Sequence, residues 1–309
     1  MNPYPARRPN TYTASPIDRA AHRRDDEAWI ASAIASADAL FVPVWRAKSL
    51  VRETDASIEA VFLTGDAATA VRLADGPWAF LGLLGDRPVF AVDVSAAEDP
   101  VPLLPPELGA GFSDLRAATI AGLPADEAAI LAHARALMHW RSRHRFCGVC
   151  GAQCEPRSAG NVMHCPGCGA QHFPRTDPAV IMLVTHGDRA LLGQSHRFPR
   201  ARMYSTLAGF VEPGESLEEA VRREVREEAG IELADVWYHS SQPWPYPAQI
   251  MLGFVAGAAT EEIVIDPEEL RDARWFTREQ VHDREALGFE LPPDLSIARR
   301  LIDDWLAGA

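Results

Sequence analysis

The sequence has no long apolar run, no excess of positive charge and no cysteine outside one short window. Its longest clean apolar stretch, Ala179–Val184, is far shorter than the roughly 20 residues that a membrane-spanning helix needs. Residues 1–24 are polar and contain no apolar core of the kind found in secretory signals. We therefore expect a cytoplasmic protein with no membrane partner.

The charge balance excludes a further class of function. The chain has 30 Lys and Arg against 43 Asp and Glu, a net charge of −13. This balance argues against non-specific binding to duplex nucleic acid, which depends on cationic side chains. It suits a globular enzyme, and a small anionic substrate would then need local cations or metal ions to bind.

Length and composition indicate an ordinary globular chain of about two domains. The 309 residues are 47% hydrophobic and 24% charged. We expect a loose arm over residues 1–24, an N-terminal α+β domain over 25–142, a cysteine-rich segment over 143–175 and a second domain over 176–309. The N-terminal domain contains no GxGxxG, GxxxxGK[ST], HExxH or GxSxG motif.

The apolar patterns predict helices and strands in both domains. In the N-terminal domain we expect helices over Asp25–Ala37 and Asp126–Arg141, and strands over Ser57–Leu63 and Pro88–Val94. In the C-terminal domain we expect strands over Ala179–Thr185, Arg189–Ser195, Trp237–Ser240, Ile250–Ala256 and Ala273–Phe276, and a helix over Ser296–Leu306. This order predicts an α+β fold, a sandwich of helices on a mixed sheet.

The cysteines form two Cys-x2-Cys pairs separated by fourteen residues, namely Cys147, Cys150, Cys165 and Cys168. Four thiolates at this spacing predict one tetrahedral Zn²⁺ site, and a closed four-thiolate site has a structural role. Two redox-active Cys-x-x-Cys pairs are the alternative. Cys154 is expected to be a bystander, and His164 is a possible substitute ligand.

A short acidic helix is the most unusual segment. Ser216 and Glu219 form a capping box that predicts its start, and Gly230 predicts its end. Three carboxylates follow at positions i, i+3 and i+4, namely Glu224, Glu227 and Glu228. Like charges at this spacing cost about 0.2–0.5 kcal/mol per pair, and acids late in a helix oppose its dipole. Helix stability alone does not select this pattern.

Two readings of the acidic helix are open. One is a solvated acidic face that Arg222, Arg223 and Arg226 neutralise. The other is a metal site, because Glu228 lies beside the apolar stripe of the helix and should be partly buried. Partly buried carboxylates grouped together favour Mg²⁺ or Mn²⁺, which prefer oxygen ligands.

The segment closely resembles the Nudix box. Gly209, Glu215 and the run Arg223–Ile231 fill every fixed position of that motif. The resemblance to the Nudix hydrolases implies a loop–helix–loop that holds divalent metals against a nucleoside diphosphate. It implies that Glu224, Glu227 and Glu228 bind metal, that Glu228 is also a base toward water, and that Arg223 and Glu215 brace the helix.

Ser241–Gln249 reads SQPWPYPAQ, and its alternating prolines predict a rigid extended loop rather than a strand. Packing of Trp244 and Tyr246 into a core is the alternative to a stacking role. The segment resembles the SQPWPFPxS motif of the NADH pyrophosphatases, with Tyr246 in place of Phe and Gln249 in place of Ser. The resemblance implies substrate contacts from Gln242, Trp244, Tyr246 and Gln249.

The same resemblance extends to further positions. It implies that Phe173 and Phe210 sandwich a base, although core packing is the alternative for Phe173. It implies a further metal ligand at Glu269 and a backbone contact at Ala298. The implied architecture is a C-terminal Nudix α/β/α sandwich over residues 176–309, a zinc ribbon over 143–175, and a Nudix-like structural and dimerisation domain over 25–142.

The resemblance implies hydrolysis of the pyrophosphate bond of NAD(H), to nicotinamide mononucleotide and AMP, by a homodimer with Mg²⁺ or Mn²⁺. One alternative is removal of NAD caps from RNA, with Arg135, Arg141, Arg143 and Arg145 as a surface for the RNA chain. A solvated helix end is the other interpretation of these arginines. A nucleotide-sensing regulator without catalysis is an alternative of a different class.

Overall fold

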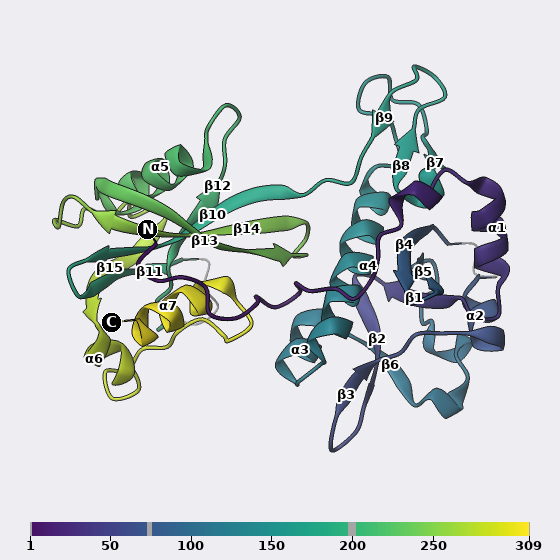
Figure 1. The fold of residues 1–309 in the computed structure, drawn as a ribbon, viewed down its shortest axis with the longest axis horizontal. Coiled ribbons are helices and arrows are strands. Elements are labelled where there is room, and N and C mark those ends of the chain that lie inside the picture. The colour runs from purple at the N-terminus through teal and green to yellow at the C-terminus, as the bar shows by residue number, and fades with distance from the viewer. Residues whose placement is uncertain (1, 73–75, 197–201, 309) are drawn as a thin grey trace. The chain divides into compact units, whose positions relative to one another are not determined.

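The computed structural model describes residues 2–72, 76–196 and 202–308. It divides into two compact units. The C-terminal unit comprises residues 1–11, 177–243 and 249–309, and the N-terminal unit comprises residues 12–176 and 244–248. Each unit is built on its own mixed β-sheet (Figure 1). Among the helices of the described ranges, none is long and apolar enough to cross a membrane.

The N-terminal unit packs helices against a mixed sheet. Its helical segments are η1 (Ala21–Arg23), α1 (Glu27–Ala35), α2 (Gly65–Arg72), η2 (Val101–Leu103), η3 (Pro106–Leu108), α3 (Leu115–Ile120) and α4 (Ala125–Arg143). Its strands are β1 (Leu40–Trp45), β2 (Lys48–Glu53), β3 (Ile58–Ala60), β4 (Trp78–Leu84), β5 (Arg87–Asp93) and β6 (Ala110–Ser113). The order is β3-β2-β1-β5-β4, with β6 paired to β2. Strands β1 and β5 run parallel.

Residues 12–24 are not part of a loose arm, so that prediction is wrong. Tyr12, Ile17 and Ala20 are all buried, and Asp18 exchanges two backbone hydrogen bonds with Leu83 at the edge of the sheet. Burial of these apolar side chains offsets the entropy lost when the segment is ordered.

The cysteine-rich segment follows α4 directly. It forms a small antiparallel sheet in the order β7-β8-β9. Its elements are β7 (Glu155–Arg157), η4 (Ser158–Gly160), β8 (Val162–His164) and β9 (Gln171–His172). A sheet this small buries little apolar surface, so it needs an additional source of stability such as a metal ion.

The C-terminal unit confirms the predicted α+β class. Its elements are β10 (Asp177–His186), β11 (Arg189–Ser195), β12 (Leu207–Phe210), α5 (Leu217–Ala229), β13 (Leu233–Trp244), β14 (Gln249–Ala258), β15 (Leu270–Thr277), α6 (Arg278–His282) and α7 (Ile297–Ala307). The strand order is β13-β14-β10-β11-β15, with β12 paired to β10. Strands β10 and β14 run parallel, while β10 and β11 form an antiparallel hairpin.

Helices cover both faces of this sheet. Helix α5 lies on one face and α7 on the other (Figure 1). Val180 and Met182 share a core with Val221 and Val225 of α5. Ile181, one residue out of phase with them, shares the opposite core with helix α7. The alternation along β10 therefore produces the three layers of the sandwich.

One predicted loop is partly a strand. Strand β13 continues to Trp244, so Ser241–Trp244 is its end, and only residues 245–248 form a turn. Pro243 is tolerated because β13 is the last strand of the order and needs no hydrogen-bond donor on its outer side.

Candidate functional site

Helix α5 forms as its sequence predicts. The Ser216 side chain accepts from the Glu219 N–H, and the Glu219 carboxylate accepts from the Ser216 N–H at 2.7 Å. Gly230 ends the helix in the left-handed region, with φ of 70°. The apolar stripe packs on the sheet, which fixes the rotation of the helix and the direction of its acidic side chains.

The Glu224 carboxylate lies against the backbone of Gly209 in β12. A Cβ atom at residue 209 would lie 1.9 Å from Cδ of Glu224, far inside van der Waals contact. Gly209 is therefore the residue that leaves room for this carboxylate. Burial raises the pKa of Glu224, and the Arg223 guanidinium opposes that shift.

Arg223 connects several acidic side chains in and next to helix α5. Its guanidinium donates to Glu215 at 2.6 and 3.0 Å, to Glu224 at 2.7 Å and to Glu227 at 2.9 Å. It also donates to the Phe210 carbonyl at 2.8 Å. These charge-assisted hydrogen bonds raise the pKa of Arg223, and they lower the pKa of Glu215. The predicted bracing role of Arg223 and Glu215 matches this geometry.

The other predicted carboxylates differ in exposure. The Glu227 side chain is 58% exposed, whereas Glu228 is buried, as its position beside the apolar stripe predicts. The Asp266 N–H donates to the Glu228 carbonyl at 3.1 Å, and the Glu269 N–H donates to Asp266 in the same turn. This turn brings Glu269 to the end of α5.

The glutamates do not form a closed cage. Within the described parts of the chain, they are not among the groups of three or more ligand atoms that lie within 4.8 Å of one another. Arg223 contacts both Glu224 and Glu227, so a guanidinium provides the positive charge next to them. The solvated-face interpretation is thus right in part, because Arg223 neutralises the two acids.

Both predicted base-stacking aromatics are exposed. Phe210 ends β12 and is 52% exposed, and Phe173 follows β9 and is 61% exposed. Core packing is therefore wrong for Phe173. Exposed aromatic rings of this size are suited to stacking on a base.

Gln242 is not placed to contact a ligand. It is completely buried, donates to the carbonyls of Thr11 and Leu295 at 3.2 and 2.8 Å, and accepts from the Ile297 N–H at 2.8 Å. Its amide therefore fixes the start of α7, including the buried Ala298. Gln249 begins β14 and pairs with Asp177 of β10.

Trp244 and Tyr246 pack inside the N-terminal unit, together with Tyr12. Both side chains are partly buried. Packing onto protein, the alternative to a stacking role, therefore covers part of the surface of both side chains. The contacting residues lie more than 100 positions away in the sequence, and no local signal identifies them.

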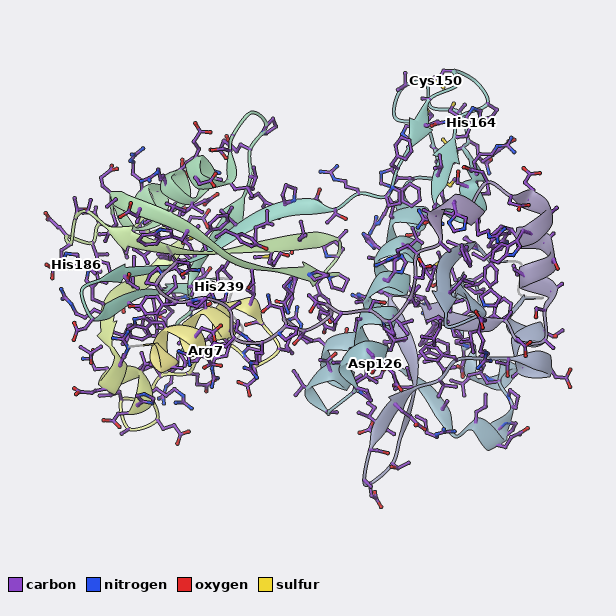
Figure 2. All side chains as sticks on the ribbon, viewed as in Figure 1. Arg7, Asp126, Cys150, His164, His186 and His239 are labelled. Carbon is purple, nitrogen blue, oxygen red and sulfur yellow. The ribbon has the colours of Figure 1, made fainter. Side chains whose placement is uncertain are left out.

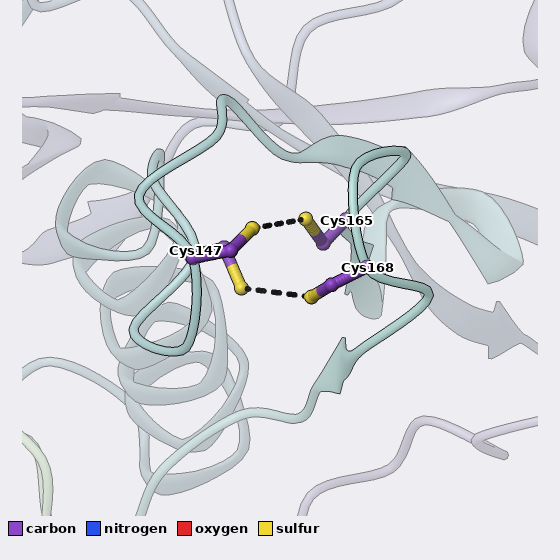
Figure 3. Close-up of side chains that lie close together, drawn as sticks. Cys147, Cys165 and Cys168 are labelled. Carbon is purple, nitrogen blue, oxygen red and sulfur yellow. Dashed lines mark hydrogen bonds between the residues drawn. The ribbon is translucent and has the colours of Figure 1, made fainter.

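The four predicted zinc ligands lie together. Cys147 and Cys168 have sulfurs 3.7 Å apart, and those of Cys150 and Cys165 are 3.4 Å apart (Figure 3). All four sulfurs lie within 4.8 Å of one another. Zn–S bonds of about 2.3 Å in a tetrahedron require sulfurs about 3.8 Å apart. Hydrogen bonds from the backbone of Cys150 and Val149 lower the pKa of Cys147 to about 5.

A second group overlaps this site. Cys147, Cys154 and His172 offer ligand atoms within 4.8 Å of one another, and His172 lies 3.4 Å from the Cys147 sulfur. Sequence reasoning treated Cys154 as a bystander and did not single out His172. His164 lies on the same ribbon as Cys150 (Figure 2), but it belongs to neither group over the described residues.

The four arginines proposed as an RNA surface separate into two pairs. Arg141 is buried and donates to the carbonyls of Trp78 and Gly160 at 2.8 and 3.3 Å. Arg135 donates to the Pro245 carbonyl at 2.8 Å. Only Arg143 and Arg145 of this set are exposed, so the prediction is wrong for Arg141, and Arg135 has a structural partner.

Three family models match successive parts of the chain. Residues 175–296 match a NUDIX domain, residues 38–140 match an NADH pyrophosphatase-like rudimentary NUDIX domain, and residues 142–173 match an NADH pyrophosphatase zinc ribbon domain. Apart from residues 141 and 174, these models together cover residues 38–296, from just before β1 to the residue before α7.

Curated relatives resemble the chain over much of its length. The NAD-capped RNA hydrolase NudC of Stutzerimonas stutzeri is 44% identical over 227 residues, which is 74% of this chain and 76% of that protein. The human NAD-capped RNA hydrolase NUDT12 is 44% identical over 58% of this chain and 42% of its own length. The chloroplastic Nudix hydrolase 19 of Arabidopsis thaliana is 54% identical over 50% of this chain and 37% of its own length.

Proposed function

Since the chain belongs to the NADH pyrophosphatase family of Nudix hydrolases, we propose that it hydrolyses the pyrophosphate bond of NAD(H) to nicotinamide mononucleotide and AMP. The observation that carries this proposal is the placement of Glu224. Its carboxylate fills the space left by the missing Cβ of Gly209, on the same helix as the buried Glu228.

The acidic residues fit divalent metal ions. Glu224, Glu227, Glu228 and Glu269 supply oxygen donors only, which Mg²⁺ and Mn²⁺ prefer. We propose these residues as the ligands, with Mg²⁺ or Mn²⁺ as the ion. Bound at this helix, such an ion neutralises phosphate oxygens and lowers the pKa of a bound water.

The protein's own residues provide positioning and charge. Arg223 holds the carboxylates in place, because it bonds both the helix and the Phe210 carbonyl of β12. Phe173 and Phe210 offer exposed rings for a base, and the backbone at Ala298 is a further proposed contact. Glu228 is proposed to take the proton of the water that forms a bond to phosphorus as the bridging P–O bond breaks.

Substitution of Glu228 tests the catalytic assignment. Glu228→Gln keeps the size of the side chain and removes its charge and basicity. We expect kcat for NADH to fall by about 10²–10⁴-fold, the range typical of a lost general base, with a small effect on the melting temperature. The assay contains either Mg²⁺ or Mn²⁺, and chromatography measures the AMP that forms.

Glu218→Gln is the matched control, since Glu218 is an exposed glutamate on the same helix. It should leave kcat within about twofold, as most surface substitutions do. Equal losses in both variants would contradict the role of Glu228. A wild-type protein that binds NADH without forming AMP would identify a nucleotide sensor instead of an enzyme.

Removal of NAD caps from RNA is a second candidate function, and one cavity favours it. Arg143 lines a cavity of about 340 Å³ with Arg46 and His139, next to the hydroxyls of Ser95 and Ser142. Asp93 is the acidic residue in this lining. A cationic hollow on a protein with a net charge of −13 suits an RNA phosphate.

Charge reversal separates the two substrates. Arg143→Glu should lower kcat/KM for NAD-capped RNA by about tenfold, because each lost phosphate contact weakens binding in a salt-dependent way. The kcat/KM for NADH should not change. Arg157→Glu, another exposed arginine of the N-terminal unit, is the control. An equal loss on both substrates would contradict a dedicated RNA surface.

We also propose a cytoplasmic homodimer. The clustered free thiols suit a reducing compartment, and twofold assemblies are the commonest oligomers of globular proteins. Light scattering after size-exclusion chromatography measures the mass directly, and a single species of 33.8 kDa at micromolar concentration would contradict the dimer.

A further inference from the structure

The last residue of β13 and the turn that follows it belong to a different unit from the rest of β13 and from β14. Residues 244–248 pack with the N-terminal unit, whereas Gln242 and Gln249 on either side pack with the C-terminal unit. This segment carries Trp244 and Tyr246, the two aromatic residues for which the family resemblance implies substrate contacts. The residues that contact it in the N-terminal unit therefore influence its conformation.

Tyr246 has a dedicated partner for its hydroxyl. Its oxygen lies 2.7 Å from the hydroxyl of Tyr12, and Tyr12 also lies 3.2 Å from the hydroxyl of Thr119. Tyr12 is only 3% exposed and Tyr246 is partly buried, so the pair is partly shielded from water. A phenylalanine at position 246 would leave the Tyr12 hydroxyl without this partner.

Two arginines contact the same ring. The Arg116 guanidinium lies 4.5 Å from the Tyr246 ring centroid and the Arg135 guanidinium lies 5.0 Å from it. A guanidinium within about 6 Å of a ring centroid is attracted by the electron-rich face of the ring. Their common placement on Tyr246 thus favours one orientation of the ring.

The backbone and the neighbouring indole are also held. Arg135 donates to the Pro245 carbonyl at 2.8 Å, and the Arg116 guanidinium lies 5.2 Å from the Trp244 ring centroid. The Trp244 and Tyr246 rings meet edge to face at 5.1 Å. Side chain and main chain of the turn are therefore fixed by the same two arginines.

We propose that Tyr12, Arg116 and Arg135 are positioning residues that clamp the Trp244–Tyr246 turn in the conformation that selects the dinucleotide. This inference rests on the proposed function for its consequence in catalysis. It assigns a task to the N-terminal unit, which carries no catalytic motif: that unit supports the selecting turn.

Hydrogen exchange tests the clamp without reference to activity. In Tyr12→Phe and in Tyr246→Phe, the amides of the four residues of 244–249 that are not proline should exchange about three- to tenfold faster than in the wild type, the change expected from one lost hydrogen bond. The double variant should exchange no faster than either single variant, because both remove the same contact. Unchanged exchange in both single variants would overturn the clamp.

Kinetics test the consequence for selection. Tyr12→Phe should raise KM for NADH by about three- to tenfold and leave kcat within about twofold. Arg135→Lys keeps the charge but loses the planar guanidinium. It should likewise raise KM for NADH and leave kcat nearly unchanged. Tyr238→Phe, which removes the hydroxyl of an exposed tyrosine on β13, is the control.

The outcomes separate the two proposals. A wild type without turnover would reject the proposed function, and the exchange data would still decide whether the clamp exists. An active wild type whose KM is unaffected by Tyr12→Phe and by Arg135→Lys would overturn the positioning role, even if exchange in the turn became faster.

Discussion

Gly209 illustrates how a single missing atom shapes the site. Its backbone pairs with Val180 of β10, so β12 does not move away easily. The Glu224 carboxylate occupies the position that a Cβ atom would take. The motif identifies the glycine from sequence, whereas the physical reason for it appears only when β12 and α5 are placed side by side.

We predict that Gly209→Ala will displace the Glu224 side chain and lower kcat by at least about 100-fold, since small misplacements at a reacting centre have effects of this size. The fold should survive, because the clash falls on the end of a side chain. Kinetics with NADH and a thermal melt measure both effects. Gly111→Ala is the control, because a Cβ there meets nothing within 4 Å. Normal turnover of Gly209→Ala would contradict the assigned role of Glu224.

Sequence reasoning at this scale succeeds where the cause is local. The burial of Glu228 follows from its angle to Val221 and Val225 on one helix, and the structure confirms it. The partners of Arg141 and Gln242 cannot be predicted in this way. They are carbonyl groups that lie 19 to 231 positions away in the chain, so only the tertiary fold brings them together.

Helix α5 is the element that the sequence predicts best. Its N-cap, its capping box and its glycine terminator are all residues of the helix ends themselves. Strand β13 shows the opposite case. Its prolines predict a loop, but the outer position in the sheet permits Pro243 within the strand, and sheet position is a property of the whole unit.

The capping box gives a prediction at the scale of this element. Ser216→Ala should destabilise the protein by about 1 kcal/mol, the typical cost of a lost N-cap. It should also weaken metal binding, because fraying at the start of α5 loosens the support of Glu224. Urea unfolding and isothermal titration with Mn²⁺ provide the two measurements.

Ser32→Ala provides the comparison, since Ser32 is exposed in the interior of α1. Alanine is the better helix former there, so this variant should be neutral or slightly stabilising. A loss of stability in Ser32→Ala equal to that in Ser216→Ala would show that the effect is not one of capping.

Across the whole molecule, the sheets of the two units share a combination of parallel and antiparallel strand pairs. Each sheet contains a parallel pair, β1 with β5 and β10 with β14, beside antiparallel pairs such as β1 with β2 and β10 with β11. Sequence reasoning found the motifs of the C-terminal unit but described only part of the N-terminal sheet. Structural strands such as β1 and β4 carry no chemical motif, and their pairing partners are set by long-range packing.

The assignment of residues 244–248 to the N-terminal unit is also inaccessible to sequence reasoning. The resemblance implies substrate contacts from this segment, but its contacts with Tyr12 and Arg116 depend on side chains that are far away in the chain. The clamp that we propose thus lies in a unit whose sequence shows no active-site pattern.

The stability of the zinc ribbon depends on a set of metal ligands rather than on an apolar core. Cys165→Ser should remove zinc and lower the melting temperature by about 10 °C or more, since metal binding contributes directly to folding. Zinc per chain is measured by mass spectrometry. Cys154→Ala, which removes the fifth thiol, should retain one zinc per chain. Loss of zinc from Cys154→Ala together with its retention in Cys165→Ser would show that the group of Cys147, Cys154 and His172 binds the ion in place of the four-cysteine set.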